Sequence, residues 1–371
     1  MAVSPDDINF MARAIRLAKR GQYTTHPNPR VGCVIVKDGK IIGEGYHQKA
    51  GQPHAEINAL RGVANGDTKG ATAYVTLEPC SHTGKTPPCA NALIESEISH
   101  VVIAMQDPNP QVAGQGIQRL RDAGIIVDVG ILEDQARGLN LGFIKRMEQG
   151  LPWIRIKLAM SLDGRTAMAS GESQWITGSA ARQDVQRLRA KADAILTGSG
   201  TLTGDDPSLN VRITSEELGL ENGLEYQQPT RVVLDSNLKI SEQAKMLKLA
   251  GDTLVYTCAN SQEKAQKLEN AGAKIITLQG KKLALKEVLQ DLAKQQINEV
   301  HVEAGATLCG ALLKEKLVDE IIIYMAPSIM GADARGLFNI PELNTMKDKI
   351  DLKIQDIRAV GDDWRLQITV L

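Results

Sequence analysis

Residues 71–90 read ATAYVTLEPCSHTGKTPPCA, and this stretch decides the fold of the first half of the chain. A run of small, β-branched and aromatic residues predicts a buried strand that leads to Pro79-Cys80. Cys89 follows two prolines and begins a segment of helical composition. Open α/β sheets bind their ligands beyond the carboxyl ends of strands, so the two cysteines mark a candidate site at a strand end and a helix start.

A third candidate ligand is His54, which lies at the expected start of a helix, two residues before Glu56. One imidazole and two thiolates suit tetrahedral Zn²⁺ and leave its fourth position to water. The positive ends of helix N-termini lower the pKa of such thiols. Glu56 can reach the water without binding the metal. In zinc nucleobase deaminases the metal activates the water, and a glutamate that is not a ligand transfers protons. We therefore predict one Zn²⁺ per chain, bound by His54, Cys80 and Cys89, with Glu56 as the proton shuttle.

Two other interpretations of these residues are a closed structural zinc site and a chance grouping that binds no metal. An H-x-E triplet alone is common, but its agreement in order with a Pro-Cys strand end and a helix-starting cysteine is much rarer. A closed site also needs a fourth protein ligand. Only His82 offers one nearby, and its place in the loop suits substrate contact better. The pattern therefore favours a catalytic zinc.

The surrounding sequence predicts the element order α-β-β-α-β-α-β-α-β for the first half. Its first helix begins after Ser4, an N-cap residue followed by Pro5 and two acidic residues. Two β-rich runs flank Asp38-Gly39, a dipeptide typical of tight hairpins.

The second half restarts after a polar segment that contains Gly150, so we place the boundary near residues 146–151 and expect domains over 1–147 and 148–371. Strand-like runs alternate there with helix-length segments, which predicts a largely parallel sheet with helices on both faces. The strand candidates are WIRIKLAM, DAILTG, TRVVLD, TLVYTC, KIITL, EVHVEAG, EIIIYMAP and RLQITVL. Residues 213–228 are polar and irregular and predict a solvent-facing excursion.

Within the second half, EVHVEAGATLCGALL (299–313) predicts a strand, a turn with Gly305 and Gly310, and a helix. The N-terminus of such a helix can hold a pyrophosphate. The segment matches neither the Walker pattern nor G-x-G-x-x-G. Taken alone, it fits an ordinary tight turn equally well.

Composition disfavours several classes of function. The 371 residues carry 43 Lys and Arg against 44 Asp and Glu, a net charge of −1, without a dense basic run, so we expect no nucleic-acid partner. No apolar run approaches the ~18 residues of a membrane span, and we expect no membrane partner. Five cysteines, an odd number, favour a reducing compartment, and we expect a cytoplasmic protein.

Four segments, PNPRVGCVIV, HAE, LEPCSHTGKTPPC and DPNP, together resemble the deaminase half of the bifunctional riboflavin-biosynthesis deaminase/reductase family, within the cytidine-deaminase-like superfamily. Eight residues separate the two cysteines, where the general P-C-x-x-C pattern has two, and this longer loop resembles the riboflavin enzymes. The resemblance implies an α/β/α fold. It also implies substrate contacts from Asn28, His82, Lys85, Asp107 and Asn109. Lys85 can bind a phosphate; the alternatives are a solvated loop cation at this position and turn-forming asparagines at 28 and 109.

Five further segments resemble the reductase half of the same family: LAMSLDGRTA, GESQWITG, ARQDVQRLRA, AILTGSGTLTGDDPSLNVR and VEAGATLCGALL. They imply a dihydrofolate-reductase-like α/β domain that uses NADPH/NADP⁺. By resemblance, the cofactor contacts are Ala159, Trp175, Thr201, Asp205, Ser236, Gly305, Ala306, Thr307, Leu308, Cys309, Gly310 and Ala311. The substrate contacts are Ser173, Arg189, Leu209, Arg212 and Glu303. The two arginines suit phosphate, which guanidinium binds bidentately; solvation or an ion pair is their alternative.

The resemblance implies a bifunctional enzyme for a small phosphoribosylaminopyrimidine, and a homodimer or higher homo-oligomer. Zinc-dependent hydrolysis converts 2,5-diamino-6-(5-phosphoribosylamino)pyrimidin-4-one to 5-amino-6-(5-phosphoribosylamino)uracil in that family, and NADPH then reduces the ribosyl group to ribityl. One alternative is a tRNA-editing deaminase, against which the net charge, the long cysteine spacer and the complete second α/β domain count. Another is a non-enzymatic zinc-stabilised protein with a nucleotide-sensing second half. Glu56 argues against the latter, because structural zinc needs no carboxylate beside it.

Overall fold

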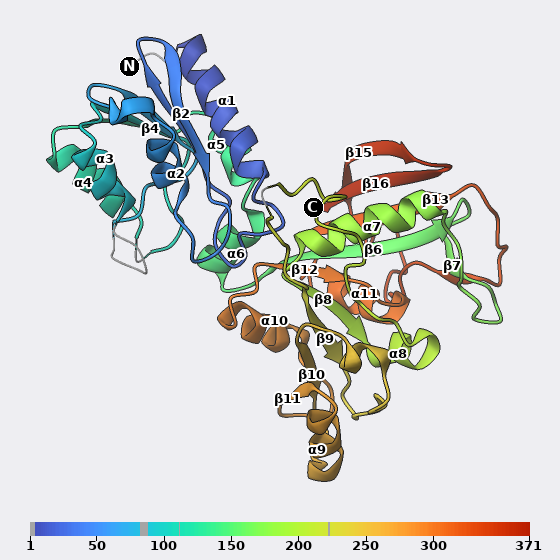
Figure 1. Ribbon diagram of the computed structural model, residues 1–371. Helices are drawn as coiled ribbons and strands as arrows, with labels where there is room; N and C mark the ends of the chain where they lie inside the picture. The colour runs from blue at the N-terminus through green and yellow to red at the C-terminus, as the bar shows by residue number, and fades with distance from the viewer. Residues whose placement is uncertain (1–3, 82–87, 111, 222) are drawn as a thin grey trace. The chain divides into compact units, whose positions relative to one another are not determined.

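The computed structural model describes residues 4–81, 88–110, 112–221 and 223–371 (Figure 1). His82 and Lys85, two of the expected substrate contacts, lie outside the described residues.

The chain forms two compact units, one of residues 1–150 with 220–226 and the other of 151–219 with 227–371. The sequence analysis places residues 220–226 in the second domain, within a solvent-facing excursion. They group with the first unit, where Glu221 forms an ion pair with Arg20 of the first helix.

The first unit is built on a five-stranded sheet with the order β2-β1-β3-β4-β5. Its strands are β1 (Gly32–Lys37), β2 (Lys40–Tyr46), β3 (Thr72–Val75), β4 (His100–Ile103) and β5 (Ile126–Val129). Strand β1 is antiparallel to β2 and β3, whereas β3, β4 and β5 are parallel. Between β1 and β2, Asp38 and Gly39 have φ angles of 51° and 72°, which confirms the hairpin predicted from this dipeptide.

Helices cover both faces of this sheet. One face packs against α1 (Pro5–Lys19), α5 (Glu133–Arg137) and α6 (Leu141–Gln149). The other packs against α2 (Ala55–Arg61), α3 (Cys89–Glu95) and α4 (Gln115–Asp122), and a 3-10 turn, η1 (Ala64–Gly66), follows α2. The two cores separate because successive strand residues point to opposite faces, as Val34 and Ile35 do. The predicted order of elements is confirmed as far as β5, but the sequence analysis did not predict the two helices that follow it, α5 and α6.

The second unit contains a nine-stranded sheet with the order β11-β10-β9-β8-β12-β6-β13-β16-β15. Its strands are β6 (Trp153–Ser161), β8 (Ala194–Gly198), β9 (Thr230–Leu234), β10 (Thr253–Thr257), β11 (Ala273–Thr277), β12 (Glu299–Val302), β13 (Glu320–Ala326), β15 (Leu352–Val360) and β16 (Asp363–Val370). The strands from β11 to β13 are parallel, and β16 and β15 are antiparallel. Strands β7 (Arg165–Ala167) and β14 (Arg335–Gly336) form a separate short ladder.

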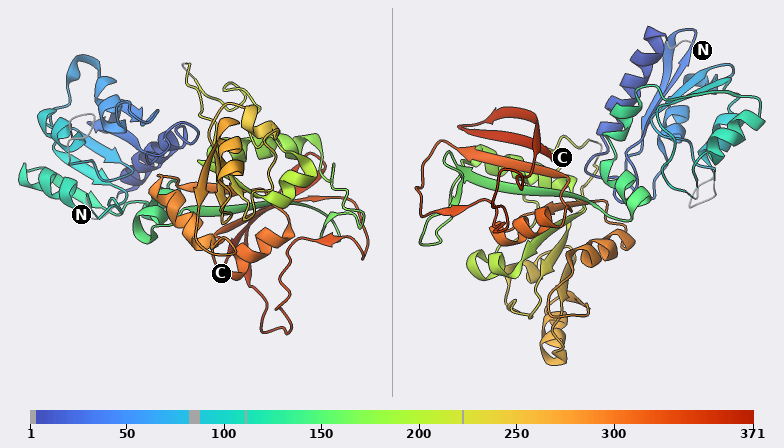
Figure 2. Two further views of the ribbon diagram at one scale, coloured as in Figure 1. Left: turned by 90° about the horizontal axis from the view of Figure 1, so that it is seen from below. Right: turned by 180° about the vertical axis from the view of Figure 1, so that it is seen from behind.

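Helices again lie on both faces, which confirms the predicted architecture of the second half. One face packs against α10 (Leu285–Lys294) and α11 (Ala306–Lys314). The other packs against α7 (Ser179–Lys191), α8 (Ser199–Asp205) and α9 (Gln262–Asn270), with a 3-10 turn, η2 (Lys245–Lys248), beside them. The left view of Figure 2 separates the orange helices α10 and α11 from the green helix α7 across the sheet. Among the described residues, no helix is both long and apolar enough to cross a bilayer.

Strand β15 is absent from the strands that the sequence predicts. It pairs with β16 at the edge of the sheet, and every residue in it except the last is exposed. Charged residues stand between the apolar ones in LKIQDIRAV. An irregularity in the pairing between Ile354 and Asp356 interrupts their alternation, so the sequence shows no continuous period-2 run.

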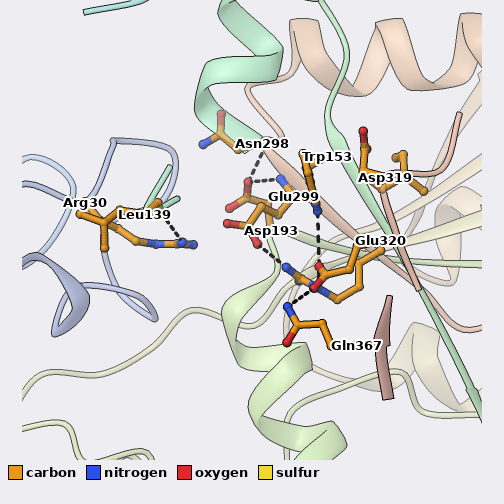
Figure 3. A network of polar contacts seen from close by, with 11 residues as sticks. Arg30, Leu139, Trp153, Asp193, Asn298, Glu299, Asp319, Glu320 and Gln367 are labelled. Atoms are coloured by element: carbon orange, nitrogen blue, oxygen red, sulfur yellow. Dashed lines mark hydrogen bonds and ion pairs between the residues drawn. The ribbon is translucent and has the colours of Figure 1, made fainter. Parts of the chain in front are cut away.

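Buried charges link the starts of three neighbouring strands, β6, β12 and β13. The Arg155 side chain, in a residue only 4% exposed, donates from Nε to Glu320 over 2.5 Å and from an Nη atom to Glu299 over 3.2 Å. Trp153 and Gln367 also donate to the Glu320 carboxylate, and Figure 3 shows these residues around it. Burial favours the protonated form of Glu320, but the Arg155 charge outweighs it and lowers the pKa of this carboxyl. The ion-paired network therefore aligns these strands in a low-dielectric interior.

Replacing Arg155 should destabilise the second unit. In Arg155→Met the two carboxylates remain buried without their cation, and we expect the free energy of unfolding to fall by about 3 kcal/mol in urea titrations. The control is Arg358→Met, which removes a cation from an exposed pair with Asp356 and should cost below about 1 kcal/mol. Equal losses in the two variants would show that the buried network is not a source of stability.

Candidate active sites

Three potential metal ligands converge in the first unit. The ligand atoms of His54, Cys80 and Cys89 all lie within 4.8 Å of one another. His54 Nδ1 is 3.3 Å from the Cys89 sulfur and 3.7 Å from the Cys80 sulfur. Zinc bonds of ~2.3 Å to sulfur and ~2.0 Å to nitrogen give nitrogen–sulfur separations of about 3.5 Å in a tetrahedron. The cluster therefore has the dimensions of a zinc site.

Local structure explains how the cluster forms. His54 is the N-cap residue of α2, Cys89 is the first residue of α3, and Cys80 follows β3. The Cys89 backbone N–H donates to the Cys80 sulfur over 3.3 Å. Hydrogen bonds from the Cys89 thiol, the His54 ring and this N–H lower the pKa of Cys80, against the effect of burial. Because metals bind thiolate rather than thiol, the fold prepares Cys80 as a ligand.

Glu56 stands beside the three ligands without joining their cluster in the described residues. It lies in the first turn of α2 and is 3% exposed. Burial, with the nearby Cys80 thiolate, raises the pKa of Glu56 to about 7, and a bound cation lowers such a value. A buried carboxyl that exchanges its proton near neutral pH suits general acid–base chemistry.

Asn28 is connected to the cluster through a histidine that the sequence analysis missed. The Asn28 amide nitrogen lies 3.1 Å from His47 Nε2, while His47 Nδ1 lies 3.2 Å from the Pro53 carbonyl. The His47 ring also meets the His54 ring edge-on at 5.2 Å. Burial lowers the pKa of His47 to about 4, so this ring is neutral and accepts from the Asn28 amide. A histidine directly after a predicted strand was the available signal.

Asp107 and Asn109 lie on the segment after β4. An Asp107 carboxylate oxygen accepts the Asn109 backbone N–H over 2.8 Å. Both residues are half-buried. The structure thus brings these two candidates together on one turn.

In the second unit, the order of the parallel strands gathers distant candidates at one sheet edge. Strands β9, β8, β12 and β6 are neighbours, so their carboxyl ends share an edge. The candidates near these ends are Ala159 on β6, Thr201 and Asp205 on α8, Ser236 after β9, and Glu303 and Gly305 after β12.

Glycines leave open space beside this edge. A Cβ added to Gly200 or Gly305 would meet nothing within 4 Å, and one added to Gly198 would touch only the end of Leu308 at 3.4 Å. Gly305 is the N-cap residue of α11. The open space and the helix N-terminus together suit a bound diphosphate.

Two of the expected cofactor contacts on α11 face the interior instead. Cys309 is fully buried, and its thiol donates to the Ala304 carbonyl. A Cβ on Gly310 would lie 2.3 Å from the Asn339 carbonyl oxygen, so this glycine serves the packing of the chain against itself. The exposed start of the helix, from Gly305 to Leu308, is the part that faces outward.

Arg189 forms an ion pair with Glu303. Its guanidinium donates to both carboxylate oxygens of Glu303, over 2.5 and 2.9 Å, and to the Asn210 carbonyl over 2.9 Å. Arg212 is exposed, and its guanidinium donates to the side-chain oxygen of Asn210 over 3.3 Å. The ion pair that the sequence analysis allowed for Arg189 is thus present, and its contact with a substrate phosphate stays a prediction.

Lys157 on β6 is a further member of this charged group that the sequence analysis missed. Burial lowers the pKa of its ammonium, against the attraction of Glu303. A lysine in the interior of a predicted strand was the signal that could have found it.

The remaining candidates differ in exposure. Trp175 is 72% exposed, and the Arg182 guanidinium lies over its ring at 4.7 Å. Ser173 shares its loop between β7 and α7. Leu209 is buried in an apolar cluster, so only its backbone could reach a substrate.

The two halves of the chain match two different family models. Residues 4–105 match the cytidine and deoxycytidylate deaminase zinc-binding region, and residues 152–366 match the RibD C-terminal domain. The riboflavin biosynthesis protein RibD of Escherichia coli (strain K12) is 52% identical over 98% of this chain and 99% of its own length. The chain belongs to the RibD family. The RibD protein of Haemophilus influenzae is likewise 52% identical over 99% of this chain and 98% of its own length.

Solved structures of RibD proteins have the same fold. One form of Acinetobacter baumannii RibD is 49% identical with a TM-score of 0.90, and each chain covers 99% of the other. A Thermotoga maritima protein, described as a diaminohydroxyphosphoribosylaminopyrimidine deaminase/5-amino-6-(5-phosphoribosylamino)uracil reductase, is 32% identical with a TM-score of 0.86 and the same coverage. The family resemblance and the fold class expected from sequence are confirmed. The chain is a bifunctional deaminase and reductase of riboflavin biosynthesis that acts on small molecules with zinc and NADPH.

Removing one ligand should empty the metal site. We expect about one zinc per chain in the parent and less than about a tenth of that in Cys80→Ala, because two ligands bind zinc far more weakly than three. Cys258→Ala, which removes a thiol outside the cluster, should keep the parental zinc content. Elemental analysis after dialysis measures both. A full complement in Cys80→Ala would exclude Cys80 as a ligand.

Proposed function

We propose that the first unit deaminates 2,5-diamino-6-(5-phosphoribosylamino)pyrimidin-4-one to 5-amino-6-(5-phosphoribosylamino)uracil, and that the second reduces its ribosyl group to ribityl with NADPH. We assign residues 1–147 to the deaminase and 148–371 to the reductase, apart from 220–226. The observation that carries the proposal is the convergence of His54, Cys80 and Cys89 beside the buried carboxyl of Glu56. The name of the Thermotoga maritima relative supports the choice of substrates.

In the first unit, the three ligands would hold the zinc, which supplies an activated water near neutral pH when it is bound. Glu56 takes a proton from the attacking water and delivers it to the departing amino group as ammonia leaves. Burial keeps this carboxyl from exchanging its proton freely with solvent. Asn28, Asp107 and Asn109 orient the pyrimidine nucleotide. We assign His82 and Lys85 to substrate and phosphate binding on the family resemblance alone.

In the second unit, the start of α11 binds the NADPH diphosphate with its backbone N–H groups, since this helix end faces open space. We keep Ala159, Thr201, Asp205, Ser236 and Trp175 as further cofactor contacts. Arg212 binds the substrate phosphate.

Glu303, whose carboxylate Arg189 holds in place, faces the substrate at the sheet edge in this proposal. Such a bidentate pair fixes the carboxylate in one orientation. Ser173 and the backbone of Leu209 complete the substrate contacts.

We propose a homodimer or higher homo-oligomer formed through the second unit. The exposed edge strand β15 supports this, because Leu352, Ile354 and Ile357 on it are 43%, 52% and 52% exposed. An unpaired edge with apolar side chains is a ready surface for a second copy. We further propose a cytoplasmic location, where the ligand thiols stay reduced, and no nucleic-acid partner, since the net charge of −1 gives little attraction to phosphate backbones.

Glu56→Gln tests the deaminase assignment. The amide keeps the shape of the side chain but cannot exchange a proton, so ammonia release should slow by at least about 10²-fold while zinc content stays parental. The same variant should reduce the already deaminated substrate at the parental rate. Glu97→Gln, an exposed change on the same unit, is the control. Slowing of less than about tenfold with zinc retained would mean that Glu56 is not the shuttle.

Gly305→Val tests the NADPH assignment. A branched side chain at the start of α11 would occupy the open space, so we expect NADPH affinity to fall at least about tenfold while ammonia release stays within about threefold of the parent. Gly310→Val is the contrasting variant, because its side chain would strike the Asn339 backbone and lower the melting temperature. Parental NADPH affinity in folded Gly305→Val would move the cofactor away from this turn.

A further inference from the structure

We propose that Glu78 is a positioning residue of the deaminase site, which sets the spacing between the turn that carries Cys80 and the segment that carries Asp107 and Asn109. This inference rests on the proposed function, because it concerns how substrate contacts are placed relative to the metal ligands. Glu78 itself is two residues from Cys80 and is not one of the three converging ligands of the described chain.

The contacts of the Glu78 carboxylate span the two segments. The residue is 3% exposed. One of its oxygens accepts from the backbone N–H groups of Asp107 and Gly114, over 3.2 and 2.9 Å. The other accepts from Gly116 and Ile117, over 2.8 and 3.2 Å. A single side chain thus binds four amides of the segment that follows β4.

All four of these partners are backbone N–H groups, and that explains why the position requires a carboxylate. A buried charge is costly unless hydrogen bonds or an opposite charge compensate for it. Gly116 and Ile117 lie in the first turn of α4, where the helix leaves N–H groups without intrahelical partners and carries its positive end. The carboxylate accepts hydrogen bonds from those N–H groups, and the same hydrogen bonds hold the carboxylate in one position.

Backbone packing reinforces the same spacing on both sides of Cys80. A Cβ on Gly116 would lie 2.0 Å from the Pro79 carbonyl oxygen, so glycine lets the start of α4 touch the turn directly. On the other side, an Nη atom of Arg119 donates to the Ser81 carbonyl over 2.8 Å. The residues before and after Cys80 are therefore both attached to α4.

The attachment extends to the candidate substrate contacts. Glu78 accepts the Asp107 N–H, and the Asp107 carboxylate accepts the Asn109 N–H. The Glu78 backbone N–H also donates to the Met105 carbonyl over 3.0 Å. The Glu78 contacts thereby hold the segment that carries Asp107 and Asn109 at a defined distance from the metal-ligand turn. Because these two residues are proposed to bind the substrate, displacing them should weaken substrate binding more than it slows the chemical step.

Glu78→Gln in the full-length enzyme tests the proposal. The amide keeps the size and one acceptor oxygen, but its NH₂ group faces two backbone N–H groups that it cannot accept from. We expect parental zinc content, a KM for the diamino substrate raised at least about tenfold, and kcat within about threefold. The amides of Gly114, Gly116 and Ile117 should exchange faster with deuterium. Reduction of the already deaminated substrate should be parental, which checks the second unit in the same sample.

Glu95→Gln is the matched control, because it removes the same charge from an exposed position on α3 and should be parental in every measurement. A parental KM in folded, zinc-loaded Glu78→Gln would overturn the proposal, and so would loss of zinc, since the side chain would then serve the ligands. Glu78→Asp, which keeps the charge but shortens the reach, is the second variant and should raise KM in the same direction; an unchanged KM there also overturns it. If the parent chain releases no ammonia from the diamino substrate, the proposed function itself fails.

Discussion

The end of β3 is the point on which the first unit depends. Cys80 lies in the segment that follows it, and the starts of α2 and α3 bring His54 and Cys89 close to this cysteine. Helix N-termini bring unpaired N–H groups and partial positive charge, which favour a thiolate where burial alone would oppose it. Packing against the sheet fixes both helices, so the core beneath the site also sets the separation of the ligand atoms.

The second unit has charged groups at both ends of its parallel strands. Arg189, Glu303 and Lys157 bring charge to the carboxyl edge, where a charged cofactor and a phosphorylated substrate are proposed to bind. Arg155 holds a second buried charge network at the starts of the strands. In the Arg155 network the opposite charges pair with one another and align the strands. In the group at the carboxyl edge, Arg189 pairs with Glu303, and the described contacts give Lys157 no ion pair at short range.

Much of this arrangement was predictable because it rests on local patterns. Hairpin chemistry at Asp38-Gly39 and the order of His54, Cys80 and Cys89 needed no knowledge of distant contacts. The features that the sequence did not predict share a cause: the spacing of residues along the chain does not determine which distant residue a side chain contacts. Arg189 forms an ion pair with Glu303, which lies 114 positions further along the chain, and Gly310 packs against the backbone of Asn339. Strand β15 was not predicted because the irregularity between Ile354 and Asp356 interrupts the alternation on which strand prediction relies.

The contact between Gly116 and Pro79 has a consequence for thermal motion. Side chains that separate two elements can change rotamer, and the gap between the elements then fluctuates with them. Here the start of α4 meets a carbonyl oxygen with no side chain between, at a place where even a methyl group would not fit. The distance between the start of α4 and the turn before Cys80 is thus set by bond lengths and atomic radii, which vary little with temperature. Warming should loosen the surrounding loops well before it changes this distance.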